Sequence, residues 1–259
     1  MAKEVIWGGS ALHVVGDKYA EFANKHNNVI TRSHFEDILE GRKHQAVDVK
    51  QFVFGQGIPF RDRRLLATRF SERGLDKNAS LNVGMLNPEL ASHRTTHKVH
   101  ERNILITEPV VQVEDGAYES DLIVDEACAE LDDHVTGQHI SAAVLSEAAR
   151  QMCNAVLHGS LMTPEVADRS YFLIDKLTVV FSCYVLPMPA RFRCIVLESS
   201  SNARSMSSRF TIRVECIQKG IAAATFSASV AVFEKNFISS VESQVARRVC
   251  GLEESEALI

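Results

Sequence analysis

The stretch SAAVLSEAARQMCNAVLHGSLM (141–162) decides the fold, because its composition predicts one helix that is buried over most of its circumference. Most of its residues are small or apolar, among them Ala148, Ala149, Met152 and Cys153. A helix of this kind must pack against other elements on nearly all sides. We therefore expect it to be the central helix of its domain.

The polar residues of this helix form one stripe. They stand at positions i, i+3, i+4, i+7 and i+11, which places them on the same face: Glu147, Arg150, Gln151, Asn154 and His158. One interpretation is an exposed edge, with Glu147 and Arg150 as an ordinary surface pair. The other is a buried wall of an active site, where a carboxylate and a guanidinium are retained for chemistry.

The loop before the helix favours the second interpretation. DDHVTGQHI (132–140) places two acids, two histidines and a glycine directly before the helix N-terminus. Backbone amides at such a place can bind an oxyanion or a phosphate. His134 or His139 can act as a base, because imidazole accepts a proton near neutral pH. The structural alternative is a solvated acidic turn, with Gly137 serving only the turn.

The rest of this domain is rich in strand patterns. Apolar and β-branched runs precede the acidic loop, and four longer runs follow the helix, at 171–186, 190–199, 207–217 and 221–233. The last two runs are separated by QKG, which is typical of a hairpin. One helix followed by a long antiparallel sheet that wraps around it predicts an α+β fold.

The N-terminal part of the chain has a different texture. Strand-like and helix-like segments alternate, which predicts a small α/β region with a parallel sheet: strands at 5–16 and 51–57, and helices at 17–26, 33–41 and 59–74. The last helix is rich in arginine and is either a solvated basic face or a grip for a phosphate or an acidic carrier protein. We divide the chain into an α/β region of unknown role (1–90), the main domain (91–237) and a C-terminal helix and tail (238–259).

Composition excludes several classes of protein. The chain has 259 residues with 46% hydrophobic and 24% charged residues, which is typical of a globular protein and not of a disordered one. Its net charge of −5 argues against binding nucleic acid through phosphates. No apolar run approaches the roughly 20 residues that span a bilayer, and the N-terminus lacks a secretory pattern, so we expect a cytoplasmic protein.

The six cysteines do not indicate a metal site or disulfides. None forms a CxxC pair, and no cluster of cysteine and histidine has zinc-finger spacing. Most lie in apolar runs, as Cys153 and Cys183 do. We expect these two thiols to be buried and free.

The loop and helix together resemble a known family. HVTGQHISAAVLSEAARQM (134–152) resembles the signature of the A-factor biosynthesis (AfsA-type) hotdog family, and KVHERNILITEP (98–109) resembles the segment that opens its domain. The resemblance covers residues 98–237 and implies a hotdog, an antiparallel sheet wrapped around a central helix. Carried over by position, it implies a catalytic carboxylate and its arginine partner, with accompanying site residues: Glu147 and Arg150, with Gly137, Gln138, His139 and Gln151. We add His134 as a catalytic candidate and Asn154 as a binding candidate.

The resemblance implies chemistry on acyl thioesters. The expected activity is transfer of a (β-keto)acyl group from an acyl carrier protein or CoA to a hydroxyl, such as that of dihydroxyacetone phosphate, in synthesis of a butyrolactone-type signal or secondary metabolite. No cofactor is expected. Glu147 would act as general base with a pKa raised by burial, Arg150 would hold a phosphate or Glu147, and amides near Gly137–Ile140 would bind the oxyanion. A thioesterase or dehydratase, or a non-catalytic acyl-binding regulatory module, remain alternatives.

Two features depart from the family pattern. Members of the butyrolactone pathway carry two hotdog repeats, whereas this chain has room for one. A single hotdog leaves an edge strand unpaired, so we expect a homodimer. The helix entry reads SAAVLSEA in place of a Gly-Met-like pair, which would reshape the acyl tunnel.

Overall fold

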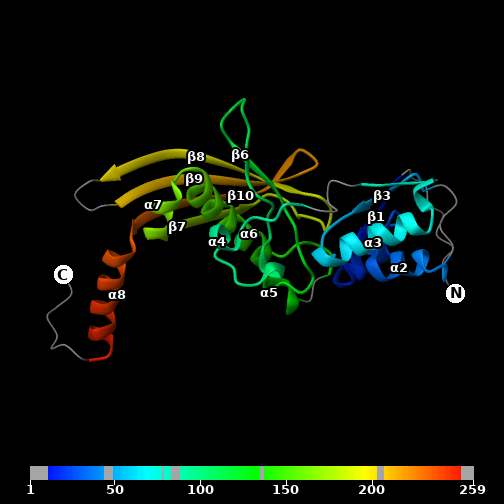
Figure 1. Ribbon diagram of the computed structural model, residues 1–259, viewed down its shortest axis with the longest axis horizontal. Coiled ribbons are helices and arrows are strands. Elements are labelled where there is room, and N and C mark those ends of the chain that lie inside the picture. The colour runs from blue at the N-terminus through cyan, green and yellow to red at the C-terminus, as the bar shows by residue number, and fades with distance from the viewer. Residues whose placement is uncertain are drawn as a thin grey trace.

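The fold contains two sheets, one in each half of the chain (Figure 1). The computed structural model describes residues 11–43, 49–77, 79–82, 88–134, 137–202 and 207–251. Within these ranges a parallel sheet precedes an antiparallel sheet that packs against one central helix. The predicted α+β class, a hotdog preceded by a small α/β region, is therefore confirmed.

The N-terminal region is a parallel sheet in the order β2-β1-β3-β4 with helices between its strands. Its strands are β1 (Ala11–Val15), β2 (Val29–Thr31), β3 (Gln51–Phe54) and β4 (Ser80–Leu81), and its helices are α1 (Ala20–Lys25), α2 (Arg32–Leu39) and α3 (Phe60–Glu72). The predicted strand over 5–16 is seen from Ala11, and residues 5–10 lie outside the described ranges. Strands β2 and β4 are not among the predicted strands, because two or three residues carry no periodicity. Aromatic rings fill the core of this region: Phe35, Phe52, Phe54 and Phe70.

Residues of the second half of the chain occupy the place where the strand order of the parallel sheet reverses. Strand order reverses between β1 and β3, and such a reversal is where open parallel sheets bind ligands. Here the buried Gln56 amide donates to the Leu122 carbonyl at 2.8 Å and accepts from the Val124 amide at 2.8 Å. The Gly57 amide donates to the Val124 carbonyl at 2.8 Å. A Cβ on Gly16 would lie 2.2 Å from the carbonyl oxygen of Gly57, so only glycine fits where the two loops meet.

The second half is a six-stranded antiparallel sheet in the order β5-β6-β8-β9-β10-β7. The strands are β5 (Val110–Val111), β6 (Tyr118–Asp121), β7 (Ser170–Phe181), β8 (Arg191–Asn202), β9 (Ser207–Gln218) and β10 (Ile221–Glu234). The helices are α4 (His93–Thr96), α5 (Ala129–Asp132), α6 (Ala142–Ala155), α7 (Pro164–Arg169) and α8 (Lys235–Val249). The QKG hairpin is present, with Lys219 and Gly220 both at positive φ (52° and 78°).

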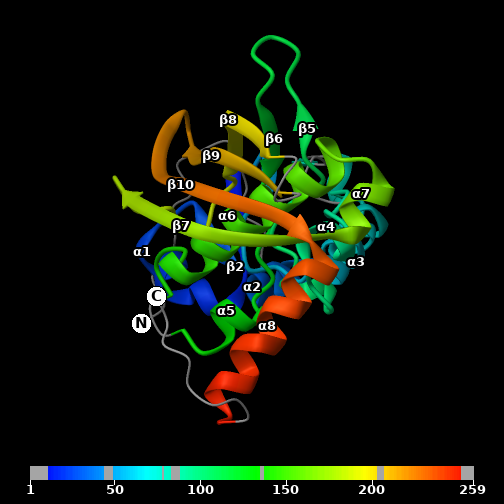
Figure 2. The ribbon, with the colours of Figure 1, turned by 90° about the vertical axis from the view of Figure 1, so that its left-hand side faces the viewer.

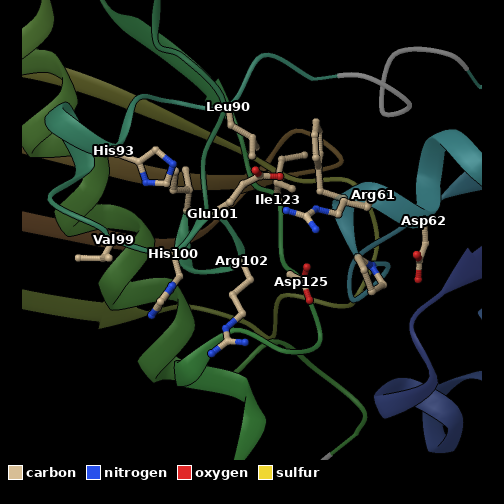
Figure 3. Close-up of a pocket in the computed structure, with 13 residues that line it drawn as sticks. Arg61, Asp62, Leu90, His93, Val99, His100, Glu101, Arg102, Ile123 and Asp125 are labelled. Carbon is tan, nitrogen blue, oxygen red and sulfur yellow. The ribbon is translucent and has the colours of Figure 1, made fainter.

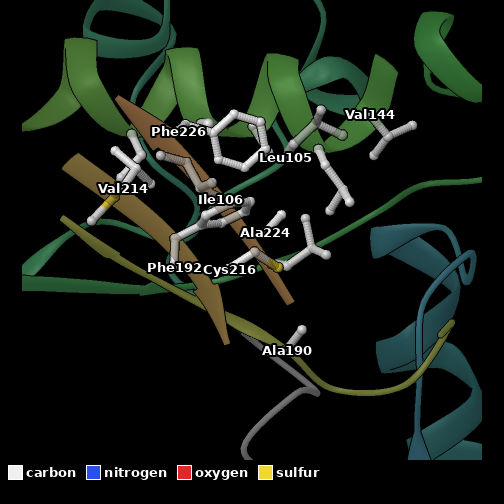
Figure 4. Packing of buried hydrophobic residues seen from close by; sticks show 14 of the residues in the cluster. Leu105, Ile106, Val144, Ala190, Phe192, Val214, Cys216, Ala224 and Phe226 are labelled. Atoms are coloured by element: carbon white, nitrogen blue, oxygen red, sulfur yellow. The ribbon is translucent and has the colours of Figure 1, made fainter. Parts of the chain in front are cut away.

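The predicted central helix is α6. Its apolar side chains pack on the inner face of the sheet, and Val144 of the helix belongs to the same buried cluster as Phe192, Val214 and Phe226 of the strands (Figure 4). Val15, Tyr19 and Phe22 of the N-terminal region join the same core. The helix begins at Ser141, whose Oγ accepts from the Val144 amide at 3.3 Å, and continues as one π-helical turn over Val156–Ser160. The expected helix over 141–162 is thus confirmed to within two residues.

Strand β7 and helix α8 lie at the margin of the sheet, and each has a side without a partner within the described residues. Strand β7 pairs with β10 along one edge, and no other described strand pairs with its second edge. Helix α8 follows β10 and has no buried residue; the tail beyond it, 252–259, lies outside the described ranges. None of the described helices is both long enough and apolar enough to pass through a membrane.

The cysteine prediction is half wrong. Cys153 on α6 is buried, but Cys183 is exposed, because it lies past the end of β7 on the rim of a cavity. The apolar run around it reflects the strand before it and not a core position.

We expect thiol labelling to divide the cysteines sharply. Cys183 and Cys250 are exposed and should react with a maleimide in the native state, whereas the other four are buried. Burial also raises the pKa of Cys128, Cys153 and Cys216 to about 12, so little thiolate forms at these sites near neutral pH. Mass spectrometry of a timed reaction measures this, and equal rates for Cys153 and Cys183 would contradict it.

Candidate active site

Glu147 is the centre of an ionic cluster on α6. Its carboxylate accepts two hydrogen bonds from Arg150, each of 2.7 Å, one to each oxygen. The same carboxylate lies 2.8 Å from the Lys98 ammonium and accepts from the Gln151 amide at 3.0 Å. Lys98 also contacts Glu130 at 3.0 Å. The arrangement satisfies the carboxylate fully and joins α6 to the chain before the sheet.

This cluster is largely shielded from water, and it lowers the pKa of Glu147 below its ordinary value. The side chain of Glu147 is 16% exposed and that of Arg150 is 30% exposed. Burial alone would raise the pKa of Glu147, but hydrogen bonds from Arg150, Lys98 and Gln151 outweigh burial and lower that pKa to about 2. The expectation of a raised pKa is therefore wrong. The sequence showed the arginine three positions away but not the lysine.

The polar stripe faces the segment that leads into the sheet. Arg150 donates to the Thr96 carbonyl at 2.9 Å. The fully buried Gln151 donates to the Asn103 carbonyl at 2.8 Å and accepts from the Leu105 amide at 2.9 Å. These bonds hold residues 96–105 against the helix. The stripe is thus not an exposed edge, and its residues do not line the cavity at the beginning of α6 or the cavity beside α3.

The far end of the stripe meets a histidine in unusual backbone geometry. The Asn154 amide lies 3.4 Å from Nδ1 of His97, whose φ of 56° is in the left-handed region. His158, in the π-helical turn, is buried beside Phe172 at a ring-centroid distance of 5.7 Å. Burial is the main cause that lowers the pKa of both histidines. The stripe therefore ends at the exposed His97 and the buried His158.

The glycine of the loop faces the N-terminal region. The Gly137 carbonyl accepts from the Phe22 amide at 3.2 Å, and a Cβ on Gly137, whose φ is 57°, would lie 2.9 Å from the Lys18 carbonyl oxygen. The Gln138 amide donates to Glu21 at 2.6 Å. These contacts bind the loop to α1 and the turn before it. Val135 and Thr136 of the same loop lie outside the described residues.

A cavity of about 450 Å³ lies at the beginning of α6. His139 is on its wall and is joined by residues of the helix start and of the chain after β7: Ile140, Ala142, Leu145, Phe181, Ser182, Cys183, Tyr184 and Val185. The His139 ring contacts the Tyr184 ring at 4.9 Å between centroids. The Ile140 amide donates to the Val185 carbonyl at 2.8 Å, so this predicted oxyanion donor is already engaged. His134 is exposed and does not line the cavity.

A second cavity, of about 510 Å³, lies between α3 and the segment 99–104 (Figure 3). Side chains of both charges line it, including Arg61, Glu101, Arg102 and Asp125. None of the residues predicted for the active site is among them. The arginine-rich helix contributes Arg61 here and buries Arg63, which donates to the Gly55 and Ile58 carbonyls at 2.7 and 3.2 Å.

The predicted site residues thus fall into separate groups. Glu147, Arg150 and Gln151 are together, and Asn154 lies on the same face of α6. Gly137 and Gln138 are turned to the N-terminal region, and His139 alone lies on the cavity. Sequence reasoning missed Lys98 and Tyr184, although Lys98 opens the segment 98–109. Neither has a spacing signal, because each reaches the site from a distant part of the chain.

Comparison with known proteins agrees with this architecture. The sequence model described as "AfsA: A-factor biosynthesis hotdog domain" matches residues 87–234, more than half of the chain. No curated protein matches. Similar solved structures include a putative thioesterase from Ralstonia eutropha JMP134 (18% identity, 49% of this chain and 82% of that one, TM-score 0.34). A putative thioesterase from Shewanella oneidensis is 11% identical over 49% of this chain and 83% of its own, with a TM-score of 0.36.

A thioesterase family protein from Silicibacter pomeroyi is 18% identical over 49% of this chain and 85% of its own, with a TM-score of 0.32. These structural likenesses are too low to carry the assignment. The match to the family model over residues 87–234 carries it, and an antiparallel sheet packed on the central helix α6 agrees with it. The chain belongs to the A-factor biosynthesis hotdog family.

Proposed function

We propose that this protein is an acyltransferase that moves a (β-keto)acyl group from a carrier-protein or CoA thioester to a small hydroxyl acceptor such as dihydroxyacetone phosphate. Membership of the family makes it an acyl-thioester-processing hotdog protein. The observation that supports a site is the cavity at the beginning of α6, which has apolar walls and one imidazole. Its volume of about 450 Å³ suits an acyl chain with part of its thioester arm.

His139 is the group that we assign as general base. It is the histidine on the cavity wall, and histidine is the side chain that most often serves as a general base in enzymes. It would take the proton of the acceptor hydroxyl while the oxygen attacks the thioester carbonyl. The new C–O bond forms, the C–S bond breaks, and the thiolate leaves with the proton that His139 held.

Glu147 has a different role in this proposal. A carboxylate with a pKa of about 2 and donors on both oxygens is a weak base. We assign it and Arg150 as positioning residues, which hold residues 96–105 on α6 and thereby fix the helix start beside His139. Turnover should therefore fall in Glu147 variants because residues 96–105 and the helix start lose their fixed positions, and not because a proton acceptor is lost.

We expect His139→Asn to lower acyl transfer by about a hundredfold while the protein stays folded. The assay incubates a β-ketoacyl-CoA with and without dihydroxyacetone phosphate and detects the acyl–triose ester by mass spectrometry. The matched control is His100→Asn, since His100 is exposed and lines the other cavity. Unchanged transfer in His139→Asn with loss in His134→Asn would move the base to the exposed loop histidine. Release of the free acid would indicate a thioesterase, and an enoyl product would indicate a dehydratase. Binding of the acyl-CoA without any product would indicate a regulatory module.

A further inference from the structure

Helix α8 lacks the contacts that a helix of its length needs. It has 15 residues and none is buried. Isolated helices of this length are marginal in water, and proteins stabilise them through a packed apolar face. Its apolar residues Phe237, Val241, Val245 and Val249 repeat every fourth position, and all are exposed. The structure therefore contains an apolar helix face that lacks a partner within the described residues.

Contacts in the N-terminal half of α8 determine the direction in which the helix extends from the sheet. Phe237 stacks on Phe233 of β10 at 6.0 Å, and the Tyr171 hydroxyl at the beginning of β7 donates to Glu242 at 3.3 Å. The helix consequently leans on the β7 side of the sheet. It extends on the same side of the sheet as α6, away from the strands (Figures 1 and 2).

The helix cannot reach the cavity of its own chain. That cavity adjoins Phe181, at the opposite end of the 12-residue strand β7. The strand spans about 35 Å, whereas α8 is only about 22 Å long and begins at the wrong end. Within one chain, the apolar face of α8 therefore does not contact the cavity, whose wall includes Tyr184 with 75% of its surface exposed.

A second copy of the chain can bring its own α8 to this cavity. The free edge of β7 exposes apolar side chains, among them Leu173, Leu177 and Val180. Antiparallel pairing of two such edges about a two-fold axis perpendicular to the sheet would satisfy the free backbone groups of both strands. The axis keeps the helices of both copies on one side. It brings the end of β7 at Phe181 next to the beginning of the other β7, where the other α8 stands.

We propose that α8 of one chain covers the acyl cavity of a second chain, with Phe237, Val241 and Val245 packed against Phe181 and Tyr184 of that chain. The proposal rests on the proposed acyl-thioester site and adds that the site is complete only in a dimer. It also accounts for the open rim of the cavity, because the missing wall is supplied by the other copy.

The test is a cross-link between α8 and the cavity rim. Val241→Cys in a Cys250→Ser chain should be joined by a short bismaleimide to Cys183 of the second copy and give a dimer band on a denaturing gel. Adding Cys183→Ser should remove the band. Ser243→Cys, on the other face of α8, is the matched control and should give none. Light scattering checks separately that the chain is a dimer.

A binding measurement tests the consequence. Val241→Glu/Val245→Glu should weaken binding of octanoyl-CoA about tenfold without changing the dimer mass, and Ser243→Glu should have no effect. A monomer in solution, or a dimer without the cross-link, would overturn the proposal. A cross-linked dimer that binds octanoyl-CoA but transfers no acyl group would overturn the proposed transferase and leave this inference standing.

Discussion

Replacing Glu147 by glutamine should destabilise the protein by about 3 kcal/mol at neutral pH. The folded carboxyl has a pKa of about 2 against an ordinary value of 4.5, and a difference of that size corresponds to about 3 kcal/mol. The carboxylate is shielded, so solvent screens the interaction little. Removing the charge also leaves Lys98 and Arg150 without their shared partner.

The same substitution should change the pH dependence of stability. Because the pKa is lowered on folding, the contribution of Glu147 is complete above about pH 4.5 and is lost as the pH falls toward 2. Denaturant melts should show a gap between the wild type and Glu147→Gln of about 3 kcal/mol at pH 7, reduced to under half by about pH 3. Glu72→Gln, at an exposed position of α3, is the control. A gap that is constant with pH would mean that the carboxylate is not paired as described.

Replacing Gln56 by leucine should separate the two halves of the chain. The side chain is fully buried, and both ends of its amide bind backbone groups of the second half. Leucine leaves the Leu122 carbonyl and the Val124 amide buried without partners, at a cost of about 1–3 kcal/mol each. We expect a total loss of about 3 kcal/mol and a second unfolding transition, because the N-terminal region then melts on its own.

Calorimetry and denaturant melts followed at two wavelengths measure this effect. Gln51→Leu is the matched control, since Gln51 begins strand β3, five residues before Gln56, is only half-buried and makes no side-chain hydrogen bond within the described residues. One unchanged transition in Gln56→Leu would show that other contacts, such as Val15, Tyr19 and Phe22 in the shared core, hold the halves together.

Much of the fold could be predicted from the sequence because periodicity and composition act locally. Helix α6 and the four long strands each carry a run long enough to identify them, and the resemblance placed them in a hotdog. The contact between Gln56 and Val124 has no such signal, since it joins residues far apart in the chain. Neither does the exposure of Cys183, which depends on where β7 ends.

The site was harder to predict for the same reason. The stripe on α6 correctly predicted that Glu147 and Arg150 meet, because three positions along a helix guarantee proximity. What the stripe faces depends on tertiary packing, and Lys98, Thr96 and Asn103 occupy that side. The loop residues Gly137 and Gln138 lie next to the predicted helix start but point to the α/β region, a partner for which the sequence offers no motif.

The crevice between β1 and β3 also has a consequence for how the protein is made. Several hydrogen bonds of the loop after β3 are made with groups from Leu122, Val124 and Pro187, the last accepting from the Gln56 backbone amide at 3.0 Å. A ribosome delivers the N-terminal strands first, and those partners emerge more than sixty residues later. The parallel sheet must therefore wait in an unfinished state, with its buried polar groups open to water, until the central hotdog segment has been synthesised.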